Sequence, residues 1–258
     1  MPNRILIAAL GLLALPMAFA QTPLRVAAAA DLEPVLPGIL SQFQQTTGIR
    51  AEATYQASSA LTAQIQNGAP FDLFLSADLS FPKRLIDAGM ADAAGSPDSS
   101  TPIPYGKGTL VLWARKDSSL PPPSLELLRY PGLRRLAIAN PDRAPYGRAA
   151  LAAIKNLKLY DSLRAHLVTA ENISQAAEFV DSGNADAGLI SLTSALTPRL
   201  STSGRYFVIP RNLYPPIEQG AVIIRHTTQR AAAHKLLDYL LSAPVQAQLA
   251  KAGITPVH

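Results

Sequence analysis

The sequence predicts an α/β fold, because short apolar runs and longer amphipathic stretches alternate along the chain. Runs such as 24–28 and 73–76 have the length and composition of buried strands, and stretches of helical period separate them. Gly48 and Gly68 end two of these stretches, and Pro70 stops the second one. This alternating order favours mostly parallel sheets that are flanked by helices.

The elements expected before position 115 follow from this patterning. Runs bounded by glycine, proline or polar residues predict strands at 24–28, 51–55, 73–76, 103–105 and 109–114. Apolar residues at helical spacing predict helices at 32–47, from Ser58 to just before Gly68, and at 81–88. Small and polar residues dominate 91–101, which is typical of a loop.

A second alternating set follows. The same criteria predict strands at 135–139, 167–170, 187–191, around 206–209 and within 218–225. They predict helices at 146–157, 174–182, 229–241 and 244–252, with a loop at 210–216.

The N-terminus has the features of an export signal. Arg4 is positively charged, the apolar core 5–15 is too short to span a bilayer, and Ala18-Phe19-Ala20 fits the rule for cleavage sites. We expect 1–20 to be a signal peptide that is cleaved after Ala20. Because no cysteine follows the apolar core, a lipid anchor is not expected, and the protein is predicted to lie in the periplasm without stable membrane insertion.

The composition excludes several classes of function. The chain has no cysteine, which removes disulfides and thiol chemistry, and its four histidines show no metal-ligand spacing. The net charge is +5, or +5 − 1 = +4 without Arg4, which either favours the approach of an anion or only keeps the protein soluble. Lysine and arginine do not cluster with aromatic residues, so nucleic-acid binding is not favoured.

The most informative stretch is 55–78. Two hydroxyls, Ser58 and Ser59, stand where a strand gives way to a helix. Free backbone N–H groups and hydroxyl donors at a helix N-terminus can bind an anion without a cationic side chain. Serines are also common as simple helix caps, and both interpretations fit the pattern.

The Ser-Ser pair and the segment Gly-Ala-Pro-Phe-Asp-Leu-Phe-Leu-Ser-Ala-Asp at 68–78 resemble the molybdate-binding proteins of bacterial ABC uptake systems. The resemblance covers nearly the whole chain after the signal. It implies the two-lobed type 2 periplasmic binding-protein fold, with a mixed, mostly parallel sheet in each lobe. The first lobe would comprise 21–104 plus 216–258 and the second 105–215, with the ligand in the cleft between them.

The resemblance also implies a set of oxyanion contacts. The segments that carry it are 26–32, 135–147, 171–173 and 186–191. They place contacts at Asp31, Ser58, Tyr146, Ile173 and Ser191, where Ile173 serves through its amide and Ser191 replaces the tyrosine of many relatives. Further candidates are Ala30, Ser59 and Ser174. Molybdenum would be held only as the oxyanion, with no direct protein ligand and no cofactor.

Asp31 departs from the pattern of the family. A carboxylate that faces a dianion repels it, strongly so in a dry site. Asp31 precedes Leu32-Glu33-Pro34, so it can cap its own helix and turn its carboxylate away from the ligand. The alternative is that the pocket takes a protonated oxyanion.

The resulting hypothesis is a periplasmic receptor that binds molybdate, and tungstate as well, and delivers it to the membrane permease of an ABC importer as a monomer. The alternative is a receptor for sulfate, thiosulfate or phosphate. An exported hydrolase is not favoured, because the chain has no Gly-x-Ser-x-Gly motif and no histidine in a catalytic context. A ligand-sensing transcription factor is not favoured either, since a signal peptide stands where a DNA-binding module would be.

Overall fold

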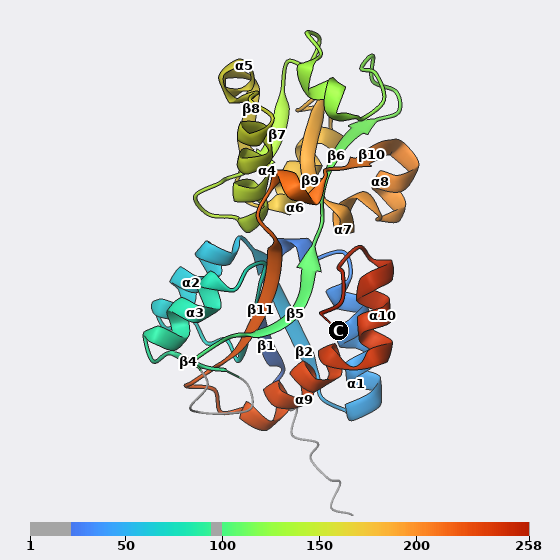
Figure 1. Ribbon diagram of the computed structural model, residues 1–258. Helices are drawn as coiled ribbons and strands as arrows, with labels where there is room; N and C mark the ends of the chain where they lie inside the picture. The colour runs from blue at the N-terminus through green and yellow to red at the C-terminus, as the bar shows by residue number, and fades with distance from the viewer. Residues whose placement is uncertain (1–21, 94–99, 258) are drawn as a thin grey trace, which may run out of the picture.

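The computed structural model describes residues 22–93 and 100–257 and has two lobes, each built on one β-sheet with helices on its faces (Figure 1). The expected α/β two-lobed fold is therefore confirmed. The expected signal peptide, 1–20, lies outside the described residues. No helix within the two described ranges is both long and apolar enough to cross a membrane.

The first lobe contains a sheet with the strand order β2-β1-β3-β11-β4, to which β5 adds by pairing with β11. Its strands are β1 (Leu24–Ala29), β2 (Ala51–Gln56), β3 (Leu73–Ser76), β4 (Ala91–Asp92), β5 (Ile103–Gly108) and β11 (Ile217–Ile224). Its helices are the 3-10 turn η1 (Ala30–Leu32), α1 (Leu36–Thr47), α2 (Ser58–Gln66), α3 (Ser80–Asp87), α9 (Arg230–Leu241) and α10 (Ala243–Lys251).

The second lobe contains a sheet with the strand order β10-β6-β9-β7-β8. Its strands are β6 (Leu110–Arg115), β7 (Leu136–Ala139), β8 (Leu167–Ala170), β9 (Ala187–Ser191) and β10 (Gly204–Val208). Its longer helices are α4 (Pro145–Asn156) and α6 (Ile173–Asp181). The short ones are η2 (Leu125–Arg129), α5 (Tyr160–Leu163), η3 (Arg164–His166), α7 (Leu192–Ala195), α8 (Pro198–Ser203) and η4 (Arg211–Leu213).

Both sheets are mixed, and parallel pairing is confined to one side of each sheet. Strands β2, β1 and β3 run parallel in one sheet, and β8, β7 and β9 do so in the other. The remaining pairings, which involve β4, β5, β6, β10 and β11, are antiparallel. Among the described residues antiparallel pairings are thus slightly more numerous, because strands that enter from the other lobe run against the parallel core.

The helix expected at 32–47 begins later than predicted. The chain forms the 3-10 turn η1, then a turn at 33–35, and α1 starts only at Leu36. Pro37 explains the shift, since proline is tolerated in the first turn of a helix but clashes with the preceding turn when it lies in the interior. Asp31 consequently belongs to a separate short turn at the end of β1.

Two segments connect the lobes, and Figure 1 shows β5 and β11 leading upward into them. β5 pairs with β11 as far as Gly108, and the chain then enters the second sheet at Leu110. The return passes through η4 into β11 at Ile217. The first sheet therefore extends a few residues beyond position 104, where the first lobe was expected to end. The rest of the lobe assignment, 21–104 plus 216–258 for the first lobe and 105–215 for the second, stays a prediction.

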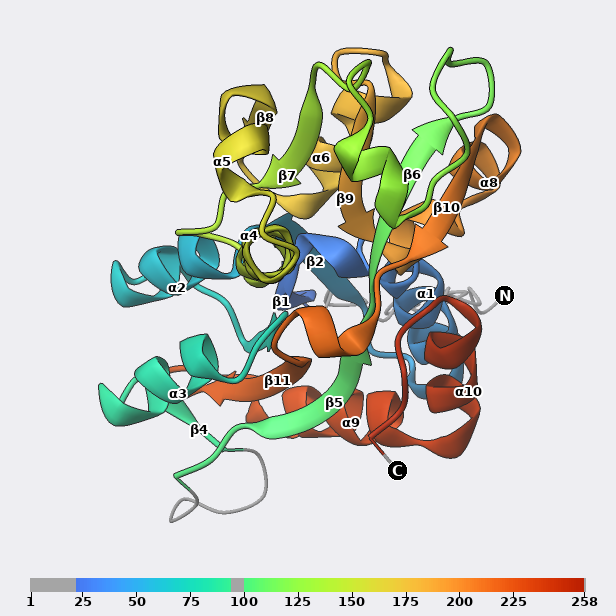
Figure 2. The ribbon, with the colours of Figure 1, turned by 45° about the horizontal axis from the view of Figure 1, so that its top comes forward.

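The lobes are in contact at the ends of their strands. Ala29, Ala30, Ala57 and Ala77 of the first lobe belong to the same buried apolar cluster as the core of the second lobe. Helix α4 stands beside β7 in the upper lobe (Figure 1, Figure 2), and its first residues, Pro145 and Tyr146, line the junction with Ala57 and Ala77 of the first lobe. The structure is therefore a closed form, in which the carboxyl ends of the parallel strands of both lobes face one another.

Candidate functional site

Four strand-to-helix turns meet between the lobes. η1 follows β1, α2 follows β2, α4 comes after β7, and α6 comes after β8. In open α/β sheets, ligands bind outside the carboxyl ends of the parallel strands, and here two such edges face each other. The first amides of each helix have no intrahelical acceptor, so this region concentrates unpaired N–H donors.

A small cavity of ≈ 10 Å³, room for about one water molecule, lies at this meeting point. The residues around it come from both lobes: Ala29, Ala30, Asp31, Gln56, Ala57, Ser58, Ala77, Ala144, Pro145, Tyr146, Asn172 and Ile173. None of these described residues is a lysine or arginine. The lining therefore suits an anion that is held by neutral donors.

Ser58 is placed as the sequence predicted, at the first position of α2 and lining the cavity. Its side chain is 1% exposed, and its Oγ accepts a hydrogen bond from the backbone N–H of Ala77 at 3.1 Å. Because the oxygen is engaged as an acceptor, the hydroxyl proton stays free to be donated. Ser58 can therefore donate a hydrogen bond to an occupant of the cavity.

Ile173 also lines the cavity, at the first position of α6. The side chain of Asn172 caps this helix by accepting a hydrogen bond from the amide of Gln175 at 3.0 Å. The cap uses the third amide of the helix, which leaves the amide of Ile173 without an intrahelical or capping acceptor. The backbone role expected for Ile173 is thus geometrically available.

Asp31 lines the cavity as well, but its carboxylate does not cap its own helix. η1 has no side-chain cap, and its N-cap residue is Ala29. The Asp31 Oδ2 instead accepts hydrogen bonds from the hydroxyl of Tyr146, at 3.1 Å, and from the side-chain amide of Gln219. The capping hypothesis is therefore wrong: the carboxylate makes no cap hydrogen bond, and its side-chain partners belong to α4 and β11.

The environment of Asp31 is dry. The residue is 0% exposed, and its Oδ1 has no hydrogen-bond partner. Burial raises the pKa of the Asp31 carboxyl from 3.8 to about 7, even though the hydrogen bonds from Tyr146 and Gln219 lower it. Near neutral pH the group is therefore close to its midpoint of protonation.

Tyr146 lines the cavity at the second position of α4. It follows Pro145 at the start of α4, and its hydroxyl is engaged with Asp31 across the lobes. Gly108 makes room for this arrangement, since a Cβ at that position would lie 2.2 Å from the Tyr146 hydroxyl oxygen. Burial, and then the charge of Asp31, raise the pKa of Tyr146 well above its usual value, so the hydroxyl stays protonated as a donor.

Three further candidates occupy different places. Ser191 is the N-cap of α7, where its Oγ accepts from the amide of Ser194 at 3.2 Å and from the hydroxyl of Thr193 at 2.8 Å, and it does not line the cavity. The Ser174 hydroxyl donates to the carbonyl of Ala30 at 2.9 Å. The amide of Ser59 donates to the carbonyl of Arg143 at 3.3 Å. Ser174 and Ser59 thus join the two lobes, while Ala30 itself lines the cavity.

Sequence reasoning missed Gln219 and Tyr105. Gln219 is 0% exposed near the start of β11, and Tyr105, in β5, donates its hydroxyl to the carbonyl of Ser76 at 3.0 Å. A glutamine directly before the apolar part of a strand was the available signal, because a buried amide needs partners. Its partner, Asp31, is too distant in the sequence to be identified from the pattern.

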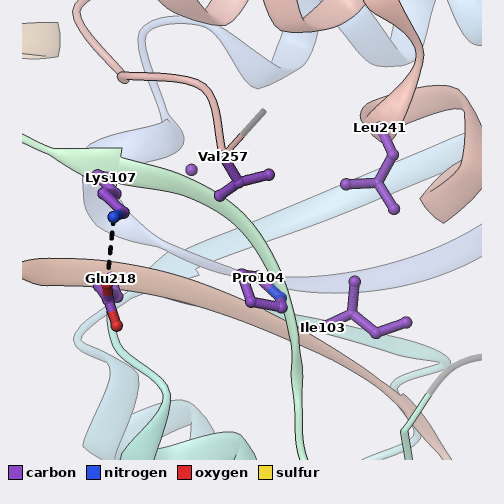
Figure 3. Close-up of a pocket in the computed structure, with 7 residues that line it drawn as sticks. Ile103, Pro104, Lys107, Glu218, Leu241 and Val257 are labelled. Atoms are coloured by element: carbon purple, nitrogen blue, oxygen red, sulfur yellow. Dashed lines mark ion pairs between the residues drawn. The ribbon is translucent and has the colours of Figure 1, made fainter.

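A larger hollow lies on the outside of the first lobe. It has a volume of ≈ 400 Å³ and is lined mainly by Ile103, Pro104, Leu241 and Val257, with an ion pair between Lys107 and Glu218 at its edge (Figure 3). Within the described residues no group of three or more histidine, cysteine, aspartate or glutamate side chains could hold a metal ion.

Comparison with known proteins identifies the family. Residues 24–255 match the model of the family described as bacterial extracellular solute-binding protein. The chain is 36% identical over 235 residues to the molybdate-binding protein ModA of Azotobacter vinelandii, covering 91% of this chain and 90% of that one. It is 35% identical over 228 residues to the ModA protein of Rhodobacter capsulatus, covering 88% and 85% of the two chains.

Solved structures show the same relation. The periplasmic molybdate-binding protein of Azotobacter vinelandii superimposes with a TM-score of 0.84 at 32% identity, over 91% of this chain and 100% of that one. The sulfate-binding protein SubI of Mycobacterium tuberculosis has a TM-score of 0.75 at 19% identity, over 92% and 87% of the two chains, which is a similarity of fold alone.

Proposed function

The chain belongs to the bacterial extracellular solute-binding protein family, and from this premise we propose that it is the molybdate-binding component of an ABC importer. It binds molybdate, and tungstate as a close chemical analogue, in the cavity between the lobes. The loaded, closed form then docks on the membrane permease of the importer. The ion is cargo, so its oxygens, and not the metal, contact the protein.

One observation carries this proposal, namely the convergence of helix N-termini from both lobes on a cavity lined without lysine or arginine. Tetrahedral oxyanions accept hydrogen bonds on every side, and only a closed pair of lobes surrounds them with donors. The Ser58 hydroxyl and the amides of Tyr146 and Ile173 are placed to donate. Neutral donors also permit release, because no unpaired buried cation is left behind.

The remaining parts of the proposal follow from this role. After the signal peptide is cleaved following Ala20, the protein works in the periplasm as a monomer. It carries no cofactor and catalyses no reaction. It binds no nucleic acid. Ser191 takes no part in the closed site, since its hydroxyl is fully engaged in capping α7.

A thermal-shift series on the protein without residues 1–20, stripped of anion, tests the ligand. At a hundred times the dissociation constant a ligand stabilises the folded state by about 2.7 kcal/mol, which raises the melting temperature of a chain of this size by roughly 5–10 °C. We expect this rise with molybdate and tungstate. A rise with sulfate or phosphate alone would contradict the proposed ligand, and the absence of any shift would contradict the oxyanion site.

Replacing Ser58 with alanine should weaken molybdate binding. A hydrogen bond to a charged group contributes about 1.5–3 kcal/mol, so we expect the dissociation constant to rise about 10- to 150-fold. Ser59→Ala is the matched control, because Ser59 contacts the second lobe through its backbone amide and does not line the cavity. Titration calorimetry of the two variants measures the difference, and equal affinities would remove Ser58 from the site.

A further inference from the structure

The cluster around Asp31 has too few protons for its hydrogen-bonding groups. Asp31 and Gln219 are in direct contact and both are 0% exposed, yet the Oδ1 of Asp31 and the Oε1 of Gln219 have no partner. Two buried acceptors without donors are unfavourable. A single proton on Asp31 converts one of these acceptors into a donor, and a turn of the Gln219 amide then lets its oxygen accept from the carboxylic acid.

The cluster is complete only while the lobes are closed. Asp31 belongs to η1 of the first lobe, whereas Tyr146 belongs to α4 of the second. Ser174 of α6 covers the same turn through its hydrogen bond to Ala30. Separation of the lobes therefore removes the Tyr146 hydroxyl and the covering helix, and admits water to the carboxylate.

We propose that Asp31 takes up a proton when the lobes close on the bound anion, so that the protein binds its tetrahedral dianion together with one proton. This inference rests on the proposed function. The unpartnered acceptors are the first reason for protonation, and the charge of the bound dianion is the second. An ionised carboxylate in the wall of the same dry cavity repels it, and a protonated one does not. Asp31 is thus the residue through which the pH outside the cell sets the affinity.

No other charge on the surrounding elements takes over this role. The titratable groups that face Asp31 are the hydroxyls of Tyr146 and Tyr105, and their pKa values are raised well above the usual range, by burial first and by Asp31 second. The charged side chains on β2, α4, β5, β11 and α6 have other partners or lie in solvent. The ion pairs are Glu52 with Arg50, Arg148 with Asp78, Lys107 with Glu218, and Asp181 with Arg199. Lys155 lies over the ring of Tyr160, and Glu178 is exposed.

The sign of the pH dependence follows from linkage. Burial raises the pKa of the closed-state carboxyl from 3.8 to about 7, whereas an exposed carboxyl in the open form titrates near its ordinary value. Between these two values the open form is ionised and the closed form is protonated. The affinity therefore falls as the pH rises, by up to about tenfold per pH unit, and levels off once the closed, loaded form also ionises.

Titration calorimetry with sodium molybdate tests the inference, in buffers of different ionisation enthalpy at about pH 6, inside this window. The dependence of the observed heat on the buffer gives the number of protons bound. We expect a value close to one for the unaltered protein and zero for Asp31→Asn. The asparagine keeps an acceptor for Tyr146 and Gln219 and carries a donor where the protonated acid has one, so it is expected to bind molybdate with an affinity that does not change with pH.

Asp92→Asn is the matched control. Asp92 lies in β4 and is paired with Arg225 and Arg230, which hold the pKa of its carboxyl below the usual value although its burial raises it. This variant should keep the proton uptake. Molybdate binding without proton uptake, or uptake that persists in Asp31→Asn, would overturn the inference and leave the proposed function intact.

Two other outcomes would also decide against it. If Asp31→Asn abolished binding of phosphate while the unaltered protein bound it, Asp31 would be the acceptor for a protonated oxyanion instead of a carrier of the proton. If neither molybdate, tungstate, sulfate nor phosphate produced heat, the proposed function and the inference would fail together.

Discussion

Replacing Ile173 with proline is expected to weaken molybdate binding about 10- to 150-fold while α6 still forms, because one charge-assisted hydrogen bond of about 1.5–3 kcal/mol is lost. Ile173 is the first residue of α6, where proline is well tolerated because that amide has no partner within the helix. The preceding Asn172 is already extended, as a residue before proline prefers. Titration calorimetry measures the loss.

The control for this substitution is Ile173→Ala. The side chain of Ile173 is 3% exposed, so its truncation weakens packing in either variant. Alanine removes at least as much of the side chain as proline does, yet it retains the amide. The difference between the two dissociation constants therefore isolates the backbone donor. Equal affinities would show that the amide of Ile173 does not contact the anion.

Replacing Gly147 with alanine is expected to lower the stability of the whole protein. A Cβ at this position would lie 2.3 Å from the carbonyl oxygen of Ala139 and 2.7 Å from the carbonyl carbon of Asn140. Both are backbone atoms that cannot rotate away, so α4 has to move away from β7. Such overpacking costs about 1–3 kcal/mol, which corresponds to a fall of roughly 2–12 °C in melting temperature. Calorimetric unfolding measures the fall.

The same substitution should also weaken anion binding, because Gly147 directly follows Tyr146 at the start of α4 and the displaced helix carries the cavity wall with it. Gly38→Ala is the matched control. Gly38 lies in α1, where an added Cβ would meet no neighbouring atom within 4 Å, and alanine is the better helix former by about 0.5–1 kcal/mol. This variant should melt at the same or a higher temperature, and an unchanged Gly147→Ala protein would contradict the close contact.

Most of the regular elements could be predicted from the sequence, because their signals are local. Gly48 has a left-handed φ of 74° at the end of α1, as a glycine that ends a helix commonly does. Shorter pieces were missed, such as α7 and α8, since four to six residues are too few to show a period. The antiparallel pairing of β11 was also missed, because pairing depends on how the chain crosses between lobes.

The site was predicted as far as helix starts mark it. Ser58, Tyr146 and Ile173 follow turn signals that are visible in the sequence, and the structure brings all three to one cavity. The orientation of the Asp31 carboxylate could not be predicted, because its partners Tyr146 and Gln219 are 115 and 188 positions away. Long-range pairing of buried polar groups leaves no periodic signal. Ser191 was expected at the site because the segment 186–191 resembles that of the family, and its hydroxyl is used for a local cap.

The hydrogen bonds between the lobes have a consequence for the fidelity of import. Three hydrogen bonds join the lobes directly: Ser174 with Ala30, Tyr146 with Asp31, and Ser59 with Arg143. Each contributes about 0.5–1.5 kcal/mol, so together they enrich the closed, empty form at least about tenfold over an otherwise identical receptor without them. Such enrichment tightens apparent affinity when the anion is scarce. It also lets receptors without an anion present the closed shape to the permease. The strength of these hydrogen bonds therefore sets the balance between tight anion binding and unproductive docking of empty receptors on the permease.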